Sequence, residues 1–178
     1  LDGTLFPYTT LFRSCLRARA GEAEAAAKYL DLYVRAFVLR NGFHANGDQT
    51  RSGLSNFTYR PFTLEGNFLA MQAVHEMLLQ SWSASPGEPH SGVIRVFPAL
   101  PARMTHAEFR DLRAEGGHVV SAQRDSGRTT WLRVTAGRSG PLRIADPFAG
   151  QPAKWTLDGA AISPTPNAAG QYEIAKEE

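Results

Sequence analysis

Residues 60–81 read RPFTLEGNFLAMQAVHEMLLQS, a run whose apolar side chains recur at three- and four-residue intervals. This spacing predicts a helix from Gly66 or Asn67 to Trp82, with apolar residues on most of its circumference. Such a helix is typical of the interior of a larger helical assembly. We therefore expect that partner helices from an upstream part of the protein cover it.

A helix is also predicted over residues 21–41, where one face of a 3.6-residue period is apolar. Asn41 and Gly42 are expected to end it, since glycine readily adopts the left-handed conformation that follows a helix. Residues 1–14, LDGTLFPYTTLFRS, show no clear period and resemble the translated sequencing-adapter sequence found at the ends of metagenomic fragments. We expect this segment to be foreign and to take no part in the fold.

From Gly92 onward the apolar period changes from helical to alternating. Strands are predicted at residues 93–97, 119–123, 129–136, 142–144 and 172–174, and Asp125-Ser126-Gly127 predicts a hairpin turn between two of them. Short strands separated by turn residues are typical of a small antiparallel β-sandwich. We accordingly expect an α+β chain with helical residues in 15–84, a linker rich in Pro, Gly and Ser in 85–91, and a β domain in 92–178.

The composition excludes several classes of function. The 178 residues include 19 Lys and Arg and 17 Asp and Glu, and the net charge of +2 is too balanced to indicate nucleic-acid binding. No apolar run approaches the roughly 20 residues that cross a bilayer. The lone Cys15 excludes an internal disulfide, and the five dispersed histidines lack the spacing of a zinc site. We expect no metal or organic cofactor, and no nucleic-acid or membrane partner.

The connection between the two predicted helices, residues 42–67, is longer than helix connections in compact domains usually are. Aromatic residues alternate there with planar hydrogen-bonding groups. This combination suits a sugar, because its hydroxyls can pair with amides, carboxylates and guanidinium groups while its C–H face meets aromatic rings. The candidate sugar-binding residues are His44, Asn46, Asp48, Tyr59, Arg60 and Asn67. The alternative is an ordered loop that caps the helices and closes on itself through side-chain turns.

Glu65 is the candidate catalytic residue. It lies at the predicted start of a largely apolar helix, where the helix dipole favours an ionised carboxylate at the rim of a bundle. The alternative is an ordinary first-turn glutamate that only stabilises the helix dipole. For Arg60 the alternatives are a substrate clamp and a ligand of backbone carbonyls, and for His44 they are a general base and a structural hydrogen-bonding group.

Three motifs in order resemble glycoside hydrolase family 95, the α-L-fucosidase-like group: RPFTLEGNFLAMQAVHEMLLQS (60–81), IRVFPALP (94–101) and LRAEGGHVVSAQR (112–124). The resemblance implies that the chain is a fragment with the terminal helices of an (α/α)6 barrel followed by a C-terminal β domain. In the family an Asp-Gly-Asn-Phe motif supplies the aspartate that activates water, and Glu65-Gly66-Asn67-Phe68 matches it with Glu in place of Asp. Tyr59-Arg60-Pro61 stands where the family tends to carry His-Pro-Pro. These departures indicate a divergent branch, whose substrate need not be fucose.

The resemblance implies an inverting O-glycosyl hydrolase that acts on a glycan or oligosaccharide, with Glu65 as the base-side carboxylate and Tyr59, Arg60 and Asn67 in the sugar pocket. The general acid of the family lies upstream of the residues that match, so we expect the chain by itself to be inactive. Because family members meet glycans outside the cytoplasm, we expect a secreted or periplasmic bacterial parent. The alternative from another class is a non-catalytic carbohydrate-binding or interaction module, in which Glu65 only caps its helix.

Overall fold

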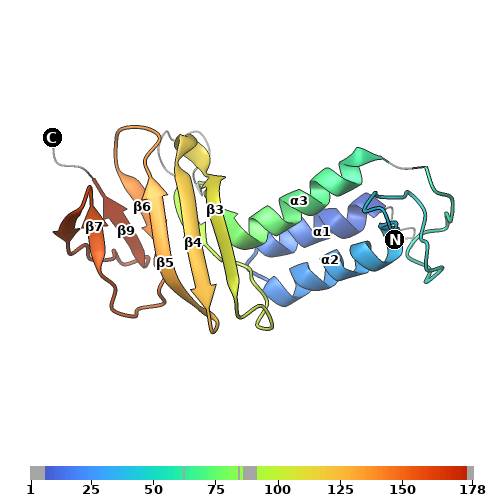
Figure 1. Cartoon of the computed structure of the whole chain (residues 1–178), viewed down its shortest axis with the longest axis horizontal. Coiled ribbons are helices and arrows are strands. Elements are labelled where there is room, and N and C mark those ends of the chain that lie inside the picture. Colours follow the sequence, from blue (N-terminus) through green and yellow to red (C-terminus); the bar gives the residue numbers. More distant parts are fainter. Residues whose placement is uncertain (1–6, 62, 84, 86–91, 176–178) are drawn as a thin grey trace. The chain divides into compact units, whose positions relative to one another are not determined.

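The computed structural model describes residues 7–61, 63–83, 85 and 92–175, and it confirms the α+β class (Figure 1). The chain divides into a helical unit, which runs to Leu78 and includes Pro98–Ala102, and a β unit, which comprises Leu79–Phe97 and the residues from Arg103 onward. The helices are α1 (Pro7–Arg19), α2 (Ala23–Phe37) and α3 (Leu64–Leu78), and the strands are β1 (Leu79–Gln80), β2 (Val93–Val96), β3 (Ala107–Arg113), β4 (Val119–Asp125), β5 (Arg128–Thr135), β6 (Leu142–Ala145), β7 (Trp155–Leu157), β8 (Ala160–Ile162) and β9 (Gln171–Ile174).

Helix α1 begins inside the segment that we expected to take no part in the fold. Leu11 and Ser14 are fully buried, and the Ser14 hydroxyl donates to the Ala26 carbonyl of α2 at 2.8 Å. The structure therefore differs from the expectation over residues 7–14, whereas the origin of the segment stays a prediction. The sequence does not predict this helix, because its buried face combines Leu11 with the small residues Ser14, Cys15 and Ala18, and the apolar period is therefore weak.

The core of the helical unit lies between its three helices. Leu11 of α1 and Tyr33, Ala36 and Phe37 of α2 are at most 1% exposed, and Leu69 of α3 packs against them. The Cys15 thiol lies 3.7 Å from the carbonyl oxygen of Leu69, so α1 and α3 are in direct contact. The core thus packs the three helices against one another, and it fixes α2 and α3 at the two ends of the loop that joins them.

Helix α2 ends at Phe37, before the predicted end near Asn41. Val38 takes an extended conformation, with φ −105° and ψ 126°, and forms a β-bridge with His44. Asn41 and Gly42 lie in the intervening turn, where the Gly42 N–H donates to the Leu39 carbonyl at 2.9 Å. Asn41 and Gly42 therefore form a turn, as predicted, but this turn reverses the chain after the helix has ended and does not cap the helix.

The predicted last turn of α3 is instead the short strand β1. Helix α3 ends at Leu78, and Leu79 and Gln80 pair with Val96 and Arg95 of β2. Local periodicity favours a longer helix, but backbone hydrogen bonds to a distant strand replace those of a further turn. The predicted end of the helix at Trp82 is therefore wrong.

Helices α1 and α3 keep several large apolar side chains in contact with solvent. These side chains, which are 39–60% exposed, are Phe12 and Leu16 of α1 and Leu64, Phe68, Met71 and Val74 of α3. The buried side of α3 carries small or polar residues as well as Met77, namely Gly66, Ala73 and Glu76. Apolar residues thus lie on the outer side of α3, as the sequence pattern predicted.

The β unit contains a sheet in the order β1-β2-β6-β9, a sheet in the order β3-β4-β5, and the pair β7-β8. The expectation of wholly antiparallel pairing is wrong for one pair, because β2 runs parallel to β6. The chain between these strands crosses through β3, β4 and β5 before it returns in the same direction (Figure 1). The predicted linker 85–91 lies outside the described residues except for Ser85.

The predicted hairpin between β4 and β5 is confirmed. Ser126 and Gly127 both have a positive φ, 49° and 77°, as a tight two-residue hairpin turn requires. Strand β3 was not predicted, because charged residues interrupt its alternation. Its register shifts between Phe109 and Leu112, where Asp111 has φ 55° and its N–H donates to the Ser121 hydroxyl at 2.9 Å.

The buried carboxylate of Glu76 in α3 pairs with Arg19 of α1. The Glu76 side chain is only 6% exposed and accepts hydrogen bonds from Arg19 Nε at 3.0 Å and Gln72 Nε2 at 2.7 Å. We predict that Arg19→Ala lowers the free energy of unfolding by about 1–3 kcal/mol, because a buried carboxylate loses its cationic partner. Urea denaturation at neutral pH measures this change.

Arg17→Ala is the matched control for this substitution. Arg17 pairs with Glu22, and both side chains are about half exposed, at 47% and 46%. Solvent screens such a pair, so we expect a loss below about 0.5 kcal/mol. Equal losses in the two variants would contradict the role assigned to the Arg19–Glu76 contact.

Candidate functional site

The loop between α2 and α3 folds back against the end of α2. The N–H groups of Ala45 and Gln49 donate to the carbonyls of Phe37 and Ala36, at 2.7 and 2.8 Å. These carbonyls belong to the last turn of the helix, where no intrahelical donor is available to them. The loop thus caps the end of α2, as the alternative interpretation of this loop expected, and its role in sugar binding stays a prediction.

Asp48 organises the first half of this loop. The carboxylate is fully buried and accepts hydrogen bonds from the backbone N–H and hydroxyl groups of Thr50 and Ser52 and from the Leu54 N–H, at 2.7–3.1 Å. Burial acts to raise the pKa of this carboxyl, but the donated hydrogen bonds outweigh it and hold the pKa below its ordinary value. With five donors around its two oxygens, Asp48 serves the loop and has little capacity left for a sugar hydroxyl.

His44 lies fully buried beneath the start of α3. Its ring stacks on Tyr33, with centroids 5.5 Å apart and planes 19° apart, and its Nε2 lies 3.1 Å from Asn46 Oδ1. Burial lowers the pKa of the imidazole, although the Asn46 contact and the charge of Glu65 act in the opposite direction. A neutral, enclosed ring favours the structural role for His44 over that of a base in contact with substrate.

Gly66 allows α3 to begin directly against this ring. A Cβ at position 66 would lie 2.4 Å from His44 Cγ, a distance that no real side chain tolerates. The neighbouring Asn67 accepts a hydrogen bond from the His44 N–H on its Oδ1 at 2.9 Å and donates from Nδ2 to the Gly42 carbonyl at 2.9 Å. The Gly66-Asn67 pair therefore fixes the loop to the first turn of α3.

Glu65 is exposed in the first turn of α3, next to Gly66. An accessible carboxylate can accept a proton from a bound water or hydroxyl. Three of the seven candidate residues are joined here by hydrogen bonds, namely His44, Asn46 and Asn67. Glu65 lies in the first turn of α3, two residues before Asn67.

Tyr59 and Arg60 form a second group along the loop. Arg60 Nε donates to Gln49 Oε1 at 2.8 Å, and Tyr59 packs edge-on against Phe57 with ring centroids 5.2 Å apart. An open depression of about 590 Å³ is lined by Arg60 and Gln49 with Val38, Leu39, Arg40 and Asn41. Glu65 does not line this depression, so the structure divides the predicted sugar contacts between two places.

Two residues of the site had no role in the sequence prediction. Tyr33 was recognised only as part of an apolar helix face, yet its ring supports His44, and burial raises the pKa of its hydroxyl to about 12. Gly66 was treated only as part of a motif. A glycine inside an apolar helical period was the available signal, because such a glycine weakens the helix unless another group approaches closely.

We predict that Gly66→Ala destabilises the chain by about 1–3 kcal/mol, because the added methyl group overlaps the His44 ring. Helix propensity alone predicts the opposite sign, a gain of about 1 kcal/mol. Thermal and urea unfolding measure the effect, and Val74→Ala, at an exposed position of the same helix, is the control. A stabilised Gly66→Ala variant would contradict the close packing of α3 on His44.

Asp48 predicts a specific dependence of stability on pH. Its pKa is lower in the folded state than in the unfolded chain, where the ordinary value is 3.8, so its contribution to stability is complete above that value. The contribution is lost as the pH falls through the folded-state pKa. We expect Asp48→Asn to be less stable than the original chain at pH 7 and the difference to shrink progressively below about pH 4. Urea unfolding between pH 2 and pH 7 tests this, and a difference that stays constant with pH would contradict it.

Comparison with known proteins assigns no family and no function to the chain. No protein-family model matches the chain, and no curated protein matches it. Within the residues that the structure describes, no group of three or more His, Cys, Asp or Glu side chains could hold a metal ion, and no helix has the length and apolar character needed to cross a membrane. The function of the site therefore has to be inferred from its own residues and their chemistry.

Proposed function

We propose that this chain is part of a carbohydrate-active O-glycosyl hydrolase similar to glycoside hydrolase family 95, and that Glu65 is its base-side carboxylate. The observation that supports this most is the placement of Glu65, an exposed carboxylate in the first turn of α3 directly before Gly66, the residue that packs against the buried His44 ring. The substrate is a glycan or oligosaccharide, and the parent protein is secreted or periplasmic. No cofactor is required, since proton transfer between carboxyl groups suffices.

In the proposed reaction Glu65 accepts a proton from the water that attacks the anomeric carbon. His44 and Asn67 act as positioning residues, because the buried ring and the amide hold the first turn of α3 in place. An inverting hydrolase needs a second carboxyl as general acid, roughly 6.5–9.5 Å from the first. Asp48 is unsuited to that role because five donors already surround it, so the proposal assigns the acid to a part of the parent outside this chain.

In the parent protein that we propose, α2 and α3 are terminal helices of an (α/α)6 barrel, and the β unit is the small sandwich domain that follows. The exposed apolar side chains of α1 and α3, such as Phe12, Phe68 and Met71, support this placement. Side chains of this size are 55%, 60% and 57% exposed, which is typical of surfaces that another element covers.

A second candidate is a non-catalytic carbohydrate-binding module. The exposed aromatic rings of Phe43, Phe57 and Tyr59 favour it, because aromatic faces cover the C–H side of a sugar ring without any chemistry. The Arg60–Gln49 pair would then supply hydrogen bonds to hydroxyl groups. In this case Glu65 only stabilises the start of α3.

The substitution Glu65→Gln separates the two candidates. In the longer parent protein, assayed on a panel of aryl α- and β-glycosides that includes α-L-fucoside and α- and β-galactosides, we expect the loss of several orders of magnitude in kcat with an unchanged melting temperature. A residue that only caps its helix would instead change stability by about 0.5–2 kcal/mol and leave kcat intact.

Glu24→Gln is the matched control, because Glu24 is the first-turn acid of α2. It should leave turnover unchanged. Turnover that survives Glu65→Gln would contradict the catalytic role. Sugar binding without turnover, unchanged by Glu65→Gln, would favour the binding module.

A further inference from the structure

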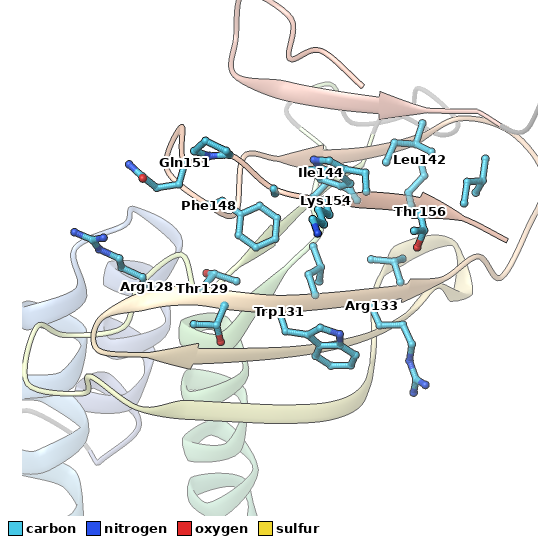
Figure 2. Close-up of a pocket in the computed structure, with 18 residues that line it drawn as sticks. Arg128, Thr129, Trp131, Arg133, Leu142, Ile144, Phe148, Gln151, Lys154 and Thr156 are labelled. Carbon is cyan, nitrogen blue, oxygen red and sulfur yellow. The ribbon is translucent and has the colours of Figure 1, made fainter. Parts of the chain in front are cut away.

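The β unit contains a cleft of about 680 Å³ that the proposed hydrolase does not use (Figure 2). Strand β5 forms one side, and β6, β7 and the segment between them form the other, with Ile174 of β9 also in the lining. The volume lies within the roughly 300–1,000 Å³ typical of small-molecule sites. The eighteen lining residues all belong to the β unit, so the cleft is complete within it.

One part of the cleft is lined by aliphatic side chains, and the polar side chains of Thr129, Thr130, Gln151 and Thr156 line other parts of it. Leu132 and Val134 of β5 and Ile144 of β6 all line the cleft, and none of the eight residues of β5 is buried. The larger side chains of β5 lie on its other face. Figure 2 shows that Trp131 and Arg133 point away from the cleft, and the Arg133 guanidinium lies 6.0 Å from the centroid of the Trp131 ring. The aliphatic residues of β5 are thus left available for an apolar ligand.

The side opposite β5 is rigid before any ligand binds. Asp146 Oδ1 accepts a hydrogen bond from the Phe148 N–H at 2.9 Å, and its Oδ2 accepts one from the Gly150 N–H at 2.5 Å. Phe148 contacts Trp155 edge-on at 5.9 Å, and Trp155 rests on the buried Tyr172 at 4.7 Å. A wall fixed in this way loses little conformational entropy when a ligand enters.

The charged groups of the lining are all cationic. Arg128, Arg133 and Lys154 line the cleft, and no Asp or Glu does. Arg133 is directed outward and pairs with Asp111 at 3.3 Å. Within the described part of the chain, no ion pair involves Arg128 or Lys154. Two cations without a carboxylate beside them favour an anionic group on the ligand.

We propose that this cleft binds a free, single-chain amphipathic carboxylate, with its hydrocarbon chain between β5 and β6 and its carboxylate at Lys154. The aliphatic side chains of Leu132, Val134 and Ile144 offer no hydrogen bonds to the hydroxyl groups of a sugar, which favours a hydrocarbon chain in that part of the cleft. The site is independent of Glu65, because it is built entirely from the β unit.

Titration of the intact chain with decanoate tests the proposal, with tryptophan fluorescence as the readout. Both Trp131 and Trp155 contribute atoms to the lining, but the Trp131 ring points away from the cleft in Figure 2, so a saturable change should disappear in Trp155→Phe and persist in Trp131→Phe. Lys154→Ala should weaken decanoate binding by about tenfold and leave the binding of the neutral 1-decanol within twofold, because only the carboxylate meets the ammonium group. Lys154 is exposed, so this variant should fold normally.

Arg133→Ala is the control, since it removes a cation of β5 that pairs with Asp111 and whose side chain points away from the cleft in Figure 2. It should leave the affinity for decanoate within twofold. The proposal would be overturned by the absence of saturable decanoate binding, by equal affinities in Lys154→Ala and the original chain, or by glucuronate binding as tightly as decanoate. The last result would identify a site for an acidic sugar.

Discussion

The close contact between the His44 ring and Gly66 is the constraint on which the helical unit depends. The buried imidazole fills the space between Tyr33 of α2 and the first turn of α3, and only a residue without a Cβ fits at position 66. The hydrogen bonds of Asn67 to the loop backbone then fix the direction in which α3 leaves. Glu65 lies one residue earlier, so its position follows from a packing contact in which its own side chain takes no part.

Three carboxylates of the helical unit show how environment separates structural from chemical roles. Asp48 is enclosed by loop donors that stabilise its charge, and Glu76 is buried against Arg19 and Gln72 between two helices. The carboxylates of Asp48 and Glu76 therefore stabilise the fold. Glu65 remains exposed in the first turn of α3, where solvent or a substrate can reach it. The proposal of Glu65 as a base depends on this difference in accessibility.

The β unit carries a different kind of chemistry from the helical unit. Its cleft combines aliphatic side chains of β5 and β6 with cations, whereas the loop between α2 and α3 combines aromatic rings with amides and a carboxylate. The first combination suits an amphipathic carboxylate and the second a sugar. The two proposals can therefore fail separately, since no residue is common to both sites.

The sequence by itself determined the elements whose side-chain period is regular: α2, most of α3, the β4–β5 hairpin and the strands β2, β6 and β9. It also placed Glu65, His44, Asn46 and Asn67 among its seven candidate residues, but it did not separate them from Asp48, Tyr59 and Arg60. Local period and turn residues act over a few positions, so they can be recognised without knowledge of the fold.

Only the tertiary structure decided where distant segments meet. It buried the weakly periodic α1 in the core, turned the end of α3 into β1, and paired β2 in parallel with β6. It likewise enclosed Asp48 among loop donors and joined Arg60 to Gln49, away from Glu65. These outcomes depend on contacts between residues far apart in the chain, whose energies can override local propensity and leave no periodic signal in the sequence.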